Sequence, residues 1–491
     1  MINDHNAYLT LGCYHQNPGL SVAVVKDGRV EIAEGFGFAD LSSRRQTKNT
    51  TLFGLASLTR SFSSLVLLKL LKDHNLTVFT RPADILGNEF RFKDDERNRY
   101  ATIRDLLAHT LGIASHNWMR FDPTLTRSNL KSRIRYFDAI KPFRTAFVTN
   151  NLMYGVITEI VEKLSGKTWE ENVKEILYDP IGMTTSKFLT KVSQQADDIA
   201  TGYSPDDETG DIVVSPFAIN EFWGELCGST CVMSNAVDMA KWMNFHLSGG
   251  KSMTGTQVYD GDMLKSSYKA HNMIVSSTMK TYFTQPKVPV TNSVSLPILT
   301  HTGTTWGYTS KITLIPDKNI GIFTALSGQD DHFIYRTTLH NYLSDVYLDI
   351  LPYLNKSSVC SYPQPWFPKP PQKSEAAFAK NLTPTHTLQT YTGKFANQPY
   401  GSLSFTVNNT ANRLMMEYGI GKWLLYPQSK PNEFAAEGIG IINKLLFISN
   451  IVFQENNGLI DRVKITDFEF NDPPIFHRDS PVKGNNINIV G

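Results

Sequence analysis

Apolar and polar positions in the first 75 residues predict a β-hairpin followed by a buried helix. Residues 19–28 read GLSVAVVKDG, an apolar run that ends at the turn pair Asp27-Gly28, and VEIAEGFGFAD continues beyond it. This is the pattern of two antiparallel strands joined by a tight turn. From Leu55 to His74, apolar residues recur at mixed spacings of three and four, which predicts a helix buried on most sides. Ser57 lies in the first turn of this predicted helix.

The middle of the chain is predicted to be helical, and strands return later. Helical patterns cover residues 103–108, residues 151–164, which are followed by Gly166, and residues 236–246, which are followed by Gly249-Gly250. Strand patterns cover residues 311–314 and 320–326, on either side of the turn Pro316-Asp317. Strands that enclose a helical middle predict a sheet assembled from distant parts of the chain.

Chain length and proline distribution predict two domains. A chain of 491 residues exceeds the size at which a single core keeps growing. Six prolines between residues 351 and 382 exclude a continuous helix or a central strand there. Beyond them, residues 387–478 contain short alternating segments such as SLSFTV and RLMMEY, broken by Gly and Asn turns. We therefore expect a first domain over residues 1–350, a Pro-rich linker over 351–382 and a β-rich domain over 383–491.

Charge and hydropathy exclude several classes of partner. The formal net charge is +2, and lysines and arginines do not form the runs that would neutralise a nucleic-acid backbone. The longest apolar stretch, Leu65–Leu71, contains Lys69 and is far shorter than the about 18 residues that cross a bilayer. The N-terminus carries Asp4, His5 and Asn6 where a signal peptide has basic and apolar residues. This favours a cytosolic location over a secreted mature form.

The four cysteines predict neither a disulfide scaffold nor a metal site. Four cysteines are too few to staple a chain of this length. Cys227 and Cys231 are four residues apart with no His or third Cys nearby, which favours two half-buried thiols over a zinc site. We expect no metal and no cofactor.

Five segments in a fixed order carry a family resemblance. They are LFGLASLTRSF (52–62), LLAHTLGIASH (106–116), FVTNNLMYGVITEIVEKLSG (147–166), LCGSTCVMSNAVDMAKWM (226–243) and HTGTTWGYTSKITLIPD (301–317). Together they resemble the serine β-lactamase and penicillin-binding-protein family over nearly all of residues 15–345. His301 in place of a lysine, and the appended β domain, are more similar to its esterase and D-aminopeptidase branch.

The resemblance implies a fold and a set of site residues. The fold is of the α/β β-lactamase and DD-peptidase type: an antiparallel sheet packed by helices, with an all-helical half and a cleft between the halves, followed here by an all-β domain. The implied nucleophile is Ser57, with its base at position 60 and a second proton carrier at position 149. The remaining implied residues orient the substrate, border the pocket or hold the oxyanion; they are Asn150, Asn151, Trp223, His301, Thr302, Gly303 and Thr304.

Physical chemistry explains why these positions matter. A serine hydroxyl is a poor nucleophile unless a neighbouring base takes its proton. Residues three apart on a helix share one face, so position 60 lies where that base is needed. Here position 60 is arginine and position 149 is threonine. Arginine stays protonated, with a pKa above about 12, and threonine is not a base.

The two replacements leave two hypotheses for function. The first is an acyl-transfer enzyme that hydrolyses an ester or amide through an acyl-Ser57 intermediate, with a non-standard base such as His301. The second is a catalytically silent descendant that keeps the cleft for binding a small-molecule or peptide-like acyl ligand. The replacements at Arg60 and Thr149 favour the second hypothesis, or a weak form of the first.

Each candidate also has a simpler interpretation. Ser57 could be a helix N-cap, and Arg60 could belong to a surface ion pair. Asn150 and Asn151 could cap the helix that follows them. His301 could be a structural histidine, and Trp223 and Tyr154 could be packing residues.

Overall fold

The chain folds into two compact units, each assembled from separate stretches of sequence. The computed structural model describes residues 17–206, 211–271, 298–330, 334–352, 354, 382–443 and 445–478. The first unit comprises Met1–Val78, Ile157–Pro205 and Gly210–Lys373, and the second comprises Phe79–Val156, Asp206–Thr209 and Ser374–Gly491. The second unit therefore combines the C-terminal segment with part of the helical middle of the chain.

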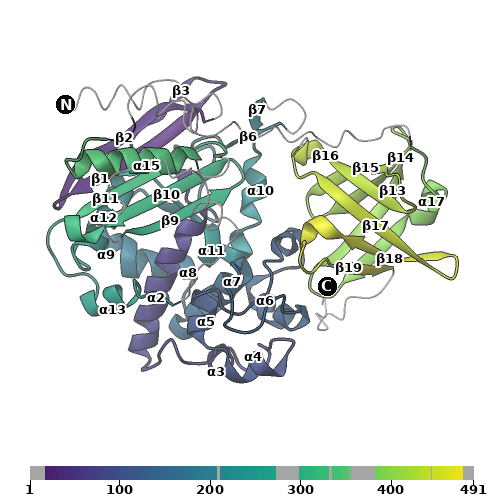
Figure 1. Cartoon of the computed structure of the whole chain (residues 1–491), viewed down its shortest axis with the longest axis horizontal. Helices are drawn as coiled ribbons and strands as arrows, with labels where there is room; N and C mark the ends of the chain where they lie inside the picture. Colours follow the sequence, from purple (N-terminus) through teal and green to yellow (C-terminus); the bar gives the residue numbers. More distant parts are fainter. Residues whose placement is uncertain are drawn as a thin grey trace. The chain divides into compact units, whose positions relative to one another are not determined.

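A six-stranded antiparallel sheet forms the centre of the first unit (Figure 1). Its strand order is β3-β2-β1-β11-β10-β9, so the N-terminal hairpin pairs directly with strands from beyond residue 298. The strands are β1 (Gly19–Lys26), β2 (Arg29–Asp40), β3 (Arg45–Gln46), β9 (Leu299–Thr305), β10 (Tyr308–Ile315) and β11 (Ile320–Leu326). The prediction of a sheet assembled from distant parts of the chain is thus confirmed, and β9 lies at its edge.

Helices cover both faces of this sheet. On one face, Val22 and Val24 of β1 pack in a cluster with Leu339 and Leu343 of α15 (Ile334–Tyr347). On the other face lies α12 (Ala236–Leu247), and it approaches so closely that a Cβ built on Gly321 would lie 3.0 Å from a side-chain atom of Met243. Because both faces are covered, β1 and β11 are buried along nearly their whole length, which explains their continuous apolar sequence.

Shorter elements complete the first unit and the helical part of the second. The first unit contains α2 (Thr59–Asp73), α8 (Trp169–Val173), α9 (Asp179–Ile181), α10 (Phe217–Glu221), α11 (Cys227–Thr230), α13 (Gly261–Ser266), β4 (Phe53–Gly54), β5 (Lys187–Phe188), β6 (Tyr203–Pro205), β7 (Ile212–Val214) and β8 (Val232–Ser234). The second contains α3 (Pro82–Leu86), α4 (Asp95–Tyr100), α5 (Ile103–Leu107), α6 (Arg127–Arg133) and α17 (Leu388–Tyr391). Helix α7 (Asn151–Ser165) begins in the second unit and ends in the first.

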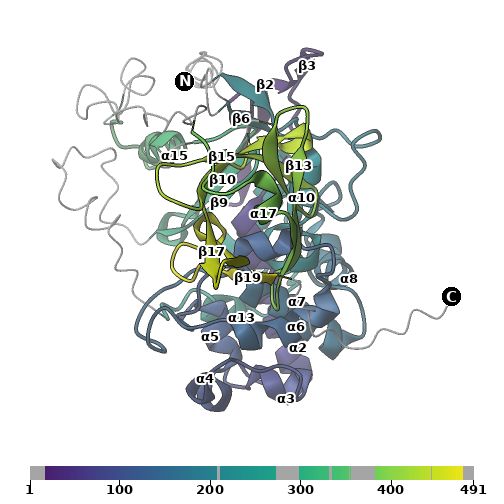
Figure 2. The ribbon, with the colours of Figure 1, turned by 90° about the vertical axis from the view of Figure 1, so that its right-hand side faces the viewer.

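The C-terminal segment forms a closed eight-stranded antiparallel barrel, which faces the viewer in Figure 2. Its strands are β12 (Gly393–Asn397), β13 (Gly401–Asn408), β14 (Arg413–Tyr418), β15 (Gly421–Pro427), β16 (Glu433–Ile439), β17 (Ile448–Asn456), β18 (Leu459–Ile465) and β19 (Ile475–Arg478). Pairing of β12 with β19 closes the barrel, which removes exposed strand edges. The all-β prediction for this segment is confirmed.

Sequence patterns and structure agree closely for most elements of the predicted fold. The predicted hairpin corresponds to β1 and β2, and the predicted helices correspond to α2, α5, α7 and α12. Helix α15 was not predicted, and residues 353 and 355–381 of the predicted linker lie outside the described residues. No helix within the described part of the chain is long and apolar enough to cross a membrane.

A buried ion pair joins α15 to Asp330, in the segment between β11 and α15, and gives a stability prediction. Arg336 Nε donates to Asp330 Oδ2 at 2.8 Å, and the two side chains are 1% and 3% exposed. Asp330→Asn leaves the guanidinium buried without its counter-charge, so we expect a loss of about 3–5 kcal/mol of unfolding free energy. Urea denaturation followed by tryptophan fluorescence measures the change.

The control for this prediction is Asp73→Asn, which breaks the exposed pair between Lys69 and Asp73 on α2. An exposed pair of this kind contributes at most about 1 kcal/mol. Equal effects of the two substitutions would contradict the assigned role of the buried pair.

Candidate active site

Ser57 lies in a strained turn rather than inside a helix. It is the middle residue of a short 3₁₀ turn, Ala56–Leu58, between β4 and α2, and its side chain is half-buried. Ala56 has a left-handed φ of +49°, a conformation that is unfavourable for alanine and that the surrounding structure must hold. The residues that precede the two helical segments are Leu55 and Leu58, so the interpretation of Ser57 as an N-cap is wrong.

The backbone before Ser57 is fastened to two strands of different sheets. The Leu55 N–H donates to Val232 O of β8 at 2.9 Å. The Leu55 carbonyl accepts a hydrogen bond from Ser310 Oγ of β10 at 2.7 Å. Both partners are distant in sequence, and the bonds are buried. The turn that carries Ser57 is therefore fixed by the tertiary structure and not by local preference.

Edge strand β9 lies directly against this turn, and Gly303 makes the approach possible. A Cβ built on Gly303 would lie 2.1 Å from Leu55 O and 2.5 Å from Ser310 Oγ. No side chain larger than hydrogen fits there. The glycine of the predicted HTG segment therefore places the β9 backbone next to the residues that precede Ser57.

Arg336 holds β9 from the opposite side, and the sequence analysis missed it. Its Nη1 donates to Gly303 O at 2.6 Å and to Ser310 O at 2.9 Å. One buried guanidinium thus joins β9, β10 and α15. Apolar residues at 334, 339, 342, 343 and 346 have helical spacing and could have predicted α15, but no local pattern predicts that Arg336 reaches β9.

His301 and Arg60 interact electrostatically. His301 is on β9 with part of its ring exposed to solvent, and Arg60 is half-buried on the first turn of α2. Loss of hydration around the ring lowers the pKa of His301 to about 4, and the positive charge of Arg60 lowers it further in the same direction. The imidazole is therefore neutral at pH 7. The place of Arg60 in the site stays a prediction.

A lysine with a lowered pKa lies elsewhere in the first unit. Burial, followed by the charge of Arg336, lowers the pKa of Lys311 to about 8. Its Nζ lies 3.5 Å from Thr337 Oγ1 of α15, whereas the neighbouring Ser310 side chain points to Leu55 on the other face of the sheet. Successive side chains of a strand alternate between faces, so Lys311 is not a replacement for the missing base beside Ser57.

Trp223 forms part of a small pocket next to the end of β9. The pocket is lined by Gly54, Leu189, Phe217, Asn220, Trp223, Thr230, Met233, Thr305 and Tyr308. Trp223 is 7% exposed, and its Nε1 donates to Thr305 Oγ1 at 3.1 Å. Thr305 Oγ1 in turn donates to Asn220 Oδ1 at 2.7 Å. Trp223 therefore both packs against β9 and lines a mostly apolar pocket.

The loop Thr149–Asn151 belongs to the second unit and is held by the segment after α5. Thr149 is exposed, and its carbonyl oxygen accepts a hydrogen bond from Ser115 Oγ at 2.6 Å. Asn150 is 2% exposed; its Nδ2 donates to Ala114 O at 2.7 Å, and its Oδ1 accepts from Met153 N at 3.2 Å. This is the capping role considered from the sequence. Asn151 is half-buried, and its Nδ2 donates to Asn117 Oδ1 at 2.9 Å.

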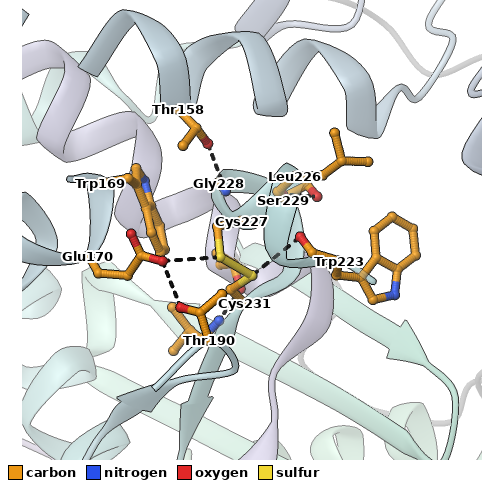
Figure 3. The surroundings of a disulfide bond; sticks show 12 residues. Thr158, Trp169, Glu170, Thr190, Trp223, Leu226, Cys227, Gly228, Ser229 and Cys231 are labelled. Carbon is orange, nitrogen blue, oxygen red and sulfur yellow. Dashed lines mark hydrogen bonds between the residues drawn. A yellow bond between two sulfur atoms is a disulfide. The ribbon is translucent and has the colours of Figure 1, made fainter. Parts of the chain in front are cut away.

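The cysteine prediction is wrong for Cys227 and Cys231, which form a disulfide (Figure 3). Both are completely buried, and their Cα atoms are 4.7 Å apart because α11 closes one helical turn between them. The sequence analysis predicted no helix there and so did not bring the two side chains together.

The disulfide lies in a segment that contacts α2. Between the two cysteines, the Gly228 carbonyl accepts from Ser63 Oγ of α2 at 2.7 Å, and the Gly228 N–H donates to Thr158 Oγ1 at 2.9 Å. Figure 3 shows Glu170 and Trp223 on either side of the sulfur atoms. The bridge therefore stabilises the segment that leads into β8. Among the described residues, no group of three or more His, Cys, Asp or Glu side chains could hold a metal ion.

Comparison with known proteins shows which sequences the chain resembles. The family model described as Beta-lactamase matches residues 10–343. Gigasin-6 of Magallana gigas is 36% identical over 241 residues, which are 48% of this chain and 78% of that protein. Unguisins hydrolase ungD of Aspergillus violaceofuscus is 23% identical over 438 residues, which are 81% of this chain and 75% of that protein.

Two solved structures show the same fold at low sequence identity. The octameric penicillin-binding protein homologue from Pyrococcus abyssi superposes with a TM-score of 0.58 at 17% identity, covering 97% of this chain and 98% of that one. A class C beta-lactamase superposes with a TM-score of 0.51 at 18% identity, covering 67% of this chain and 91% of that one. The first match extends beyond residue 350 and so includes C-terminal residues.

Removing the charge at position 60 should change the titration of His301. In Arg60→Met, we expect the pKa of His301 to rise above 4, because one of the two causes that lower it is removed. The pKa should stay below its ordinary value, because desolvation is the larger cause. An NMR titration of the imidazole between about pH 3 and 7 measures it. Lys69→Met, which removes a lysine charge from the same helix, should leave His301 unchanged.

Proposed function

The chain belongs to the beta-lactamase family, and on this basis we propose that it is a serine hydrolase scaffold of low activity. In this proposal, Ser57 attacks an ester or amide carbonyl of a small or peptide-like acyl compound. Arg60 and Thr149 replace the family's lysine and tyrosine, so proton removal from Ser57 is inefficient. The cleft then serves mainly to bind its ligand, and hydrolysis is slow or absent.

One observation carries this proposal. Tertiary contacts hold the turn that carries Ser57, while position 60 holds a fixed positive charge. The strained turn at Ala56 and the approach of Gly303 support a serine presented for reaction. The influence of Arg60 on the pKa of His301 supports a guanidinium within the site. Arg60 can stabilise an anion there, but it cannot accept a proton at neutral pH.

The expected size of the defect follows from the roles that remain. General-base catalysis typically contributes about 10²–10⁴-fold to the rate. An oxyanion donor contributes about 2.7–4 kcal/mol, and in this proposal the backbone N–H groups of Ser57 and of the Thr302–Thr304 stretch have that role. We therefore expect slow acylation of Ser57 to remain, whereas rapid hydrolysis of substrate is lost. His301, Thr302 and Asn151 would contact the substrate, and Trp223 would border its acyl group.

A second candidate is an active hydrolase that uses His301 as its base. The observation that favours it is the lowered pKa of His301, which leaves a neutral imidazole at pH 7. A neutral imidazole can accept the proton of Ser57, although a pKa of about 4 makes it a weak base. The similarity to a protein described as an unguisins hydrolase also supports this candidate.

The disulfide supports a location different from the one expected from the N-terminal residues. Disulfides form and persist mainly in oxidising compartments. We therefore propose that the chain matures in such a compartment rather than in the cytosol.

The direct test measures acylation of Ser57. The full chain is incubated with a chromogenic cephalosporin, a short p-nitrophenyl ester and a serine-directed phosphonate, and the product and the mass added to the protein are recorded. We expect a slow phosphonate adduct on Ser57, absent from Ser57→Ala, and ester turnover near the detection limit. Rapid turnover that disappears in both Ser57→Ala and His301→Gln would establish the second candidate instead.

Restoring the family's residues should raise the activity. The double substitution Arg60→Lys and Thr149→Tyr returns two titratable groups, and we expect ester hydrolysis to rise by at least about tenfold. Each single substitution should gain less, because the two groups act as a pair. A double variant that folds normally and shows no gain would argue against the assignment of positions 60 and 149.

A further inference from the structure

We propose that the C-terminal barrel positions the loop Thr149–Asn151 through residues 113–122, which we call the anchor segment. The inference rests on the proposed function, because only that proposal gives the loop a role in reactions at Ser57. The loop and the anchor segment both belong to the second unit, as does the barrel. Residues 113–115 and 117 of the anchor segment contact the loop, and His116, Trp118 and Phe121 contact the barrel.

The first half of the anchor segment binds the loop by side-chain hydrogen bonds. Ser115 Oγ donates to Thr149 O at 2.6 Å, and Asn151 Nδ2 donates to Asn117 Oδ1 at 2.9 Å. Between them, Asn150 Nδ2 donates to the carbonyls of Ile113 at 3.1 Å and Ala114 at 2.7 Å. Each residue of the loop therefore has a partner in the anchor segment, and movement of that segment would move all three.

His116 begins the contact with the barrel. It is 1% exposed and has a left-handed φ of +46°, so the surrounding structure must hold its backbone. Its N–H donates to Glu469 Oε2 at 3.1 Å, and its Nδ1 lies 2.9 Å from the hydroxyl of Tyr400. Burial lowers the pKa of His116 to about 3, so the ring is neutral at pH 7. The contact is therefore a hydrogen bond to Tyr400 and not an ion pair with the nearby Asp472.

Trp118 provides an aromatic contact with the barrel. Its ring stacks on Phe468 with a centroid distance of 4.6 Å and an interplanar angle of 10°, and it lies 6.0 Å from the ring of Trp423. Phe468 packs with further aromatic residues of the barrel, namely Tyr400, Tyr418 and Phe476. Trp118 thus extends the aromatic core of the barrel into the anchor segment.

The backbones also meet directly at the end of the anchor segment. Gly419 has a φ of +58°, and a Cβ built on it would lie 2.0 Å from Phe121 O. Arg133 Nη1 donates to Pro399 O at 3.0 Å and also contacts Asp122. These contacts place the end of the anchor segment directly against the barrel.

The interior of the barrel is filled by side chains, which favours a positioning role for the barrel and not a role in carrying a ligand. The aromatic residues that fill it are 0–2% exposed: Tyr391, Phe395, Tyr400, Phe405, Tyr418, Trp423, Phe434, Phe453, Phe468 and Phe476. Small barrels are just wide enough for side chains to fill them. A filled interior gives the barrel a rigid end on which the anchor segment can rest.

The test uses Trp118→Ala, with Trp118→Phe as the conservative variant and Leu459→Ala as the matched control. Leu459 is an apolar barrel residue that is 71% exposed and makes none of these contacts. Hydrogen exchange of the full chain is followed at the amides of Asn150 and Met153, which donate to His109 Nδ1 and Asn150 Oδ1. We expect about tenfold faster exchange in Trp118→Ala, near-normal exchange in Trp118→Phe and no change in Leu459→Ala.

Two results would overturn the positioning role. The amide of Leu55 in the first unit serves as an internal reference, since it is bonded to Val232 O. Equal acceleration there would indicate general destabilisation of the protein. Unchanged exchange at Asn150 and Met153 would show that the barrel does not hold the loop.

A second measurement connects the loop to the chemistry. The rate at which a serine-directed phosphonate labels Ser57, displacing its leaving group from phosphorus, should fall by about tenfold in Trp118→Ala and recover in Trp118→Phe. Faster exchange with unchanged labelling would overturn the link between the loop and Ser57. Absence of labelling in the unmodified protein would count against the proposed function alone, and the exchange result would still decide the positioning role.

Discussion

The contact between β9 and the turn before Ser57 is the constraint on which the site depends. Gly303 allows the β9 backbone to lie against the Leu55 carbonyl, and Ser310 bonds that carbonyl from the adjacent strand. Arg336 then fixes β9 and β10 from α15. These contacts hold Ala56 in a left-handed conformation that alanine does not favour. They therefore fix the turn that carries Ser57, immediately before α2.

The charge at position 60 determines what this support can do. A site of the same shape with lysine would hold a group that exchanges protons, whereas arginine holds a permanent cation. The charge of that cation also lowers the pKa of His301, and the lowered pKa leaves a neutral imidazole on β9 at pH 7. In the proposed function, arginine at position 60 therefore affects both the removal of the Ser57 proton and the ability of His301 to act as the base.

The sequence by itself determined the local elements and the family. Alternating and helical spacings predicted the N-terminal hairpin, the helix after Ser57, α7, α12 and the strands on either side of Pro316-Asp317. Such patterns are readable because apolar side chains repeat with the period of the element that buries them. Motif order also indicated Ser57, Arg60 and His301 as neighbours in function, because a shared fold fixes the order in which its parts occur.

Only the tertiary structure decided how these parts are supported. Trp118 of the anchor segment stacks on Phe468 of the barrel, although the two residues are 350 positions apart. The tertiary structure also pairs Cys227 with Cys231 and brings Arg336 to Gly303. Contacts of this kind leave no periodic signal, because they depend on which surfaces meet after folding and not on the spacing of residues along one element.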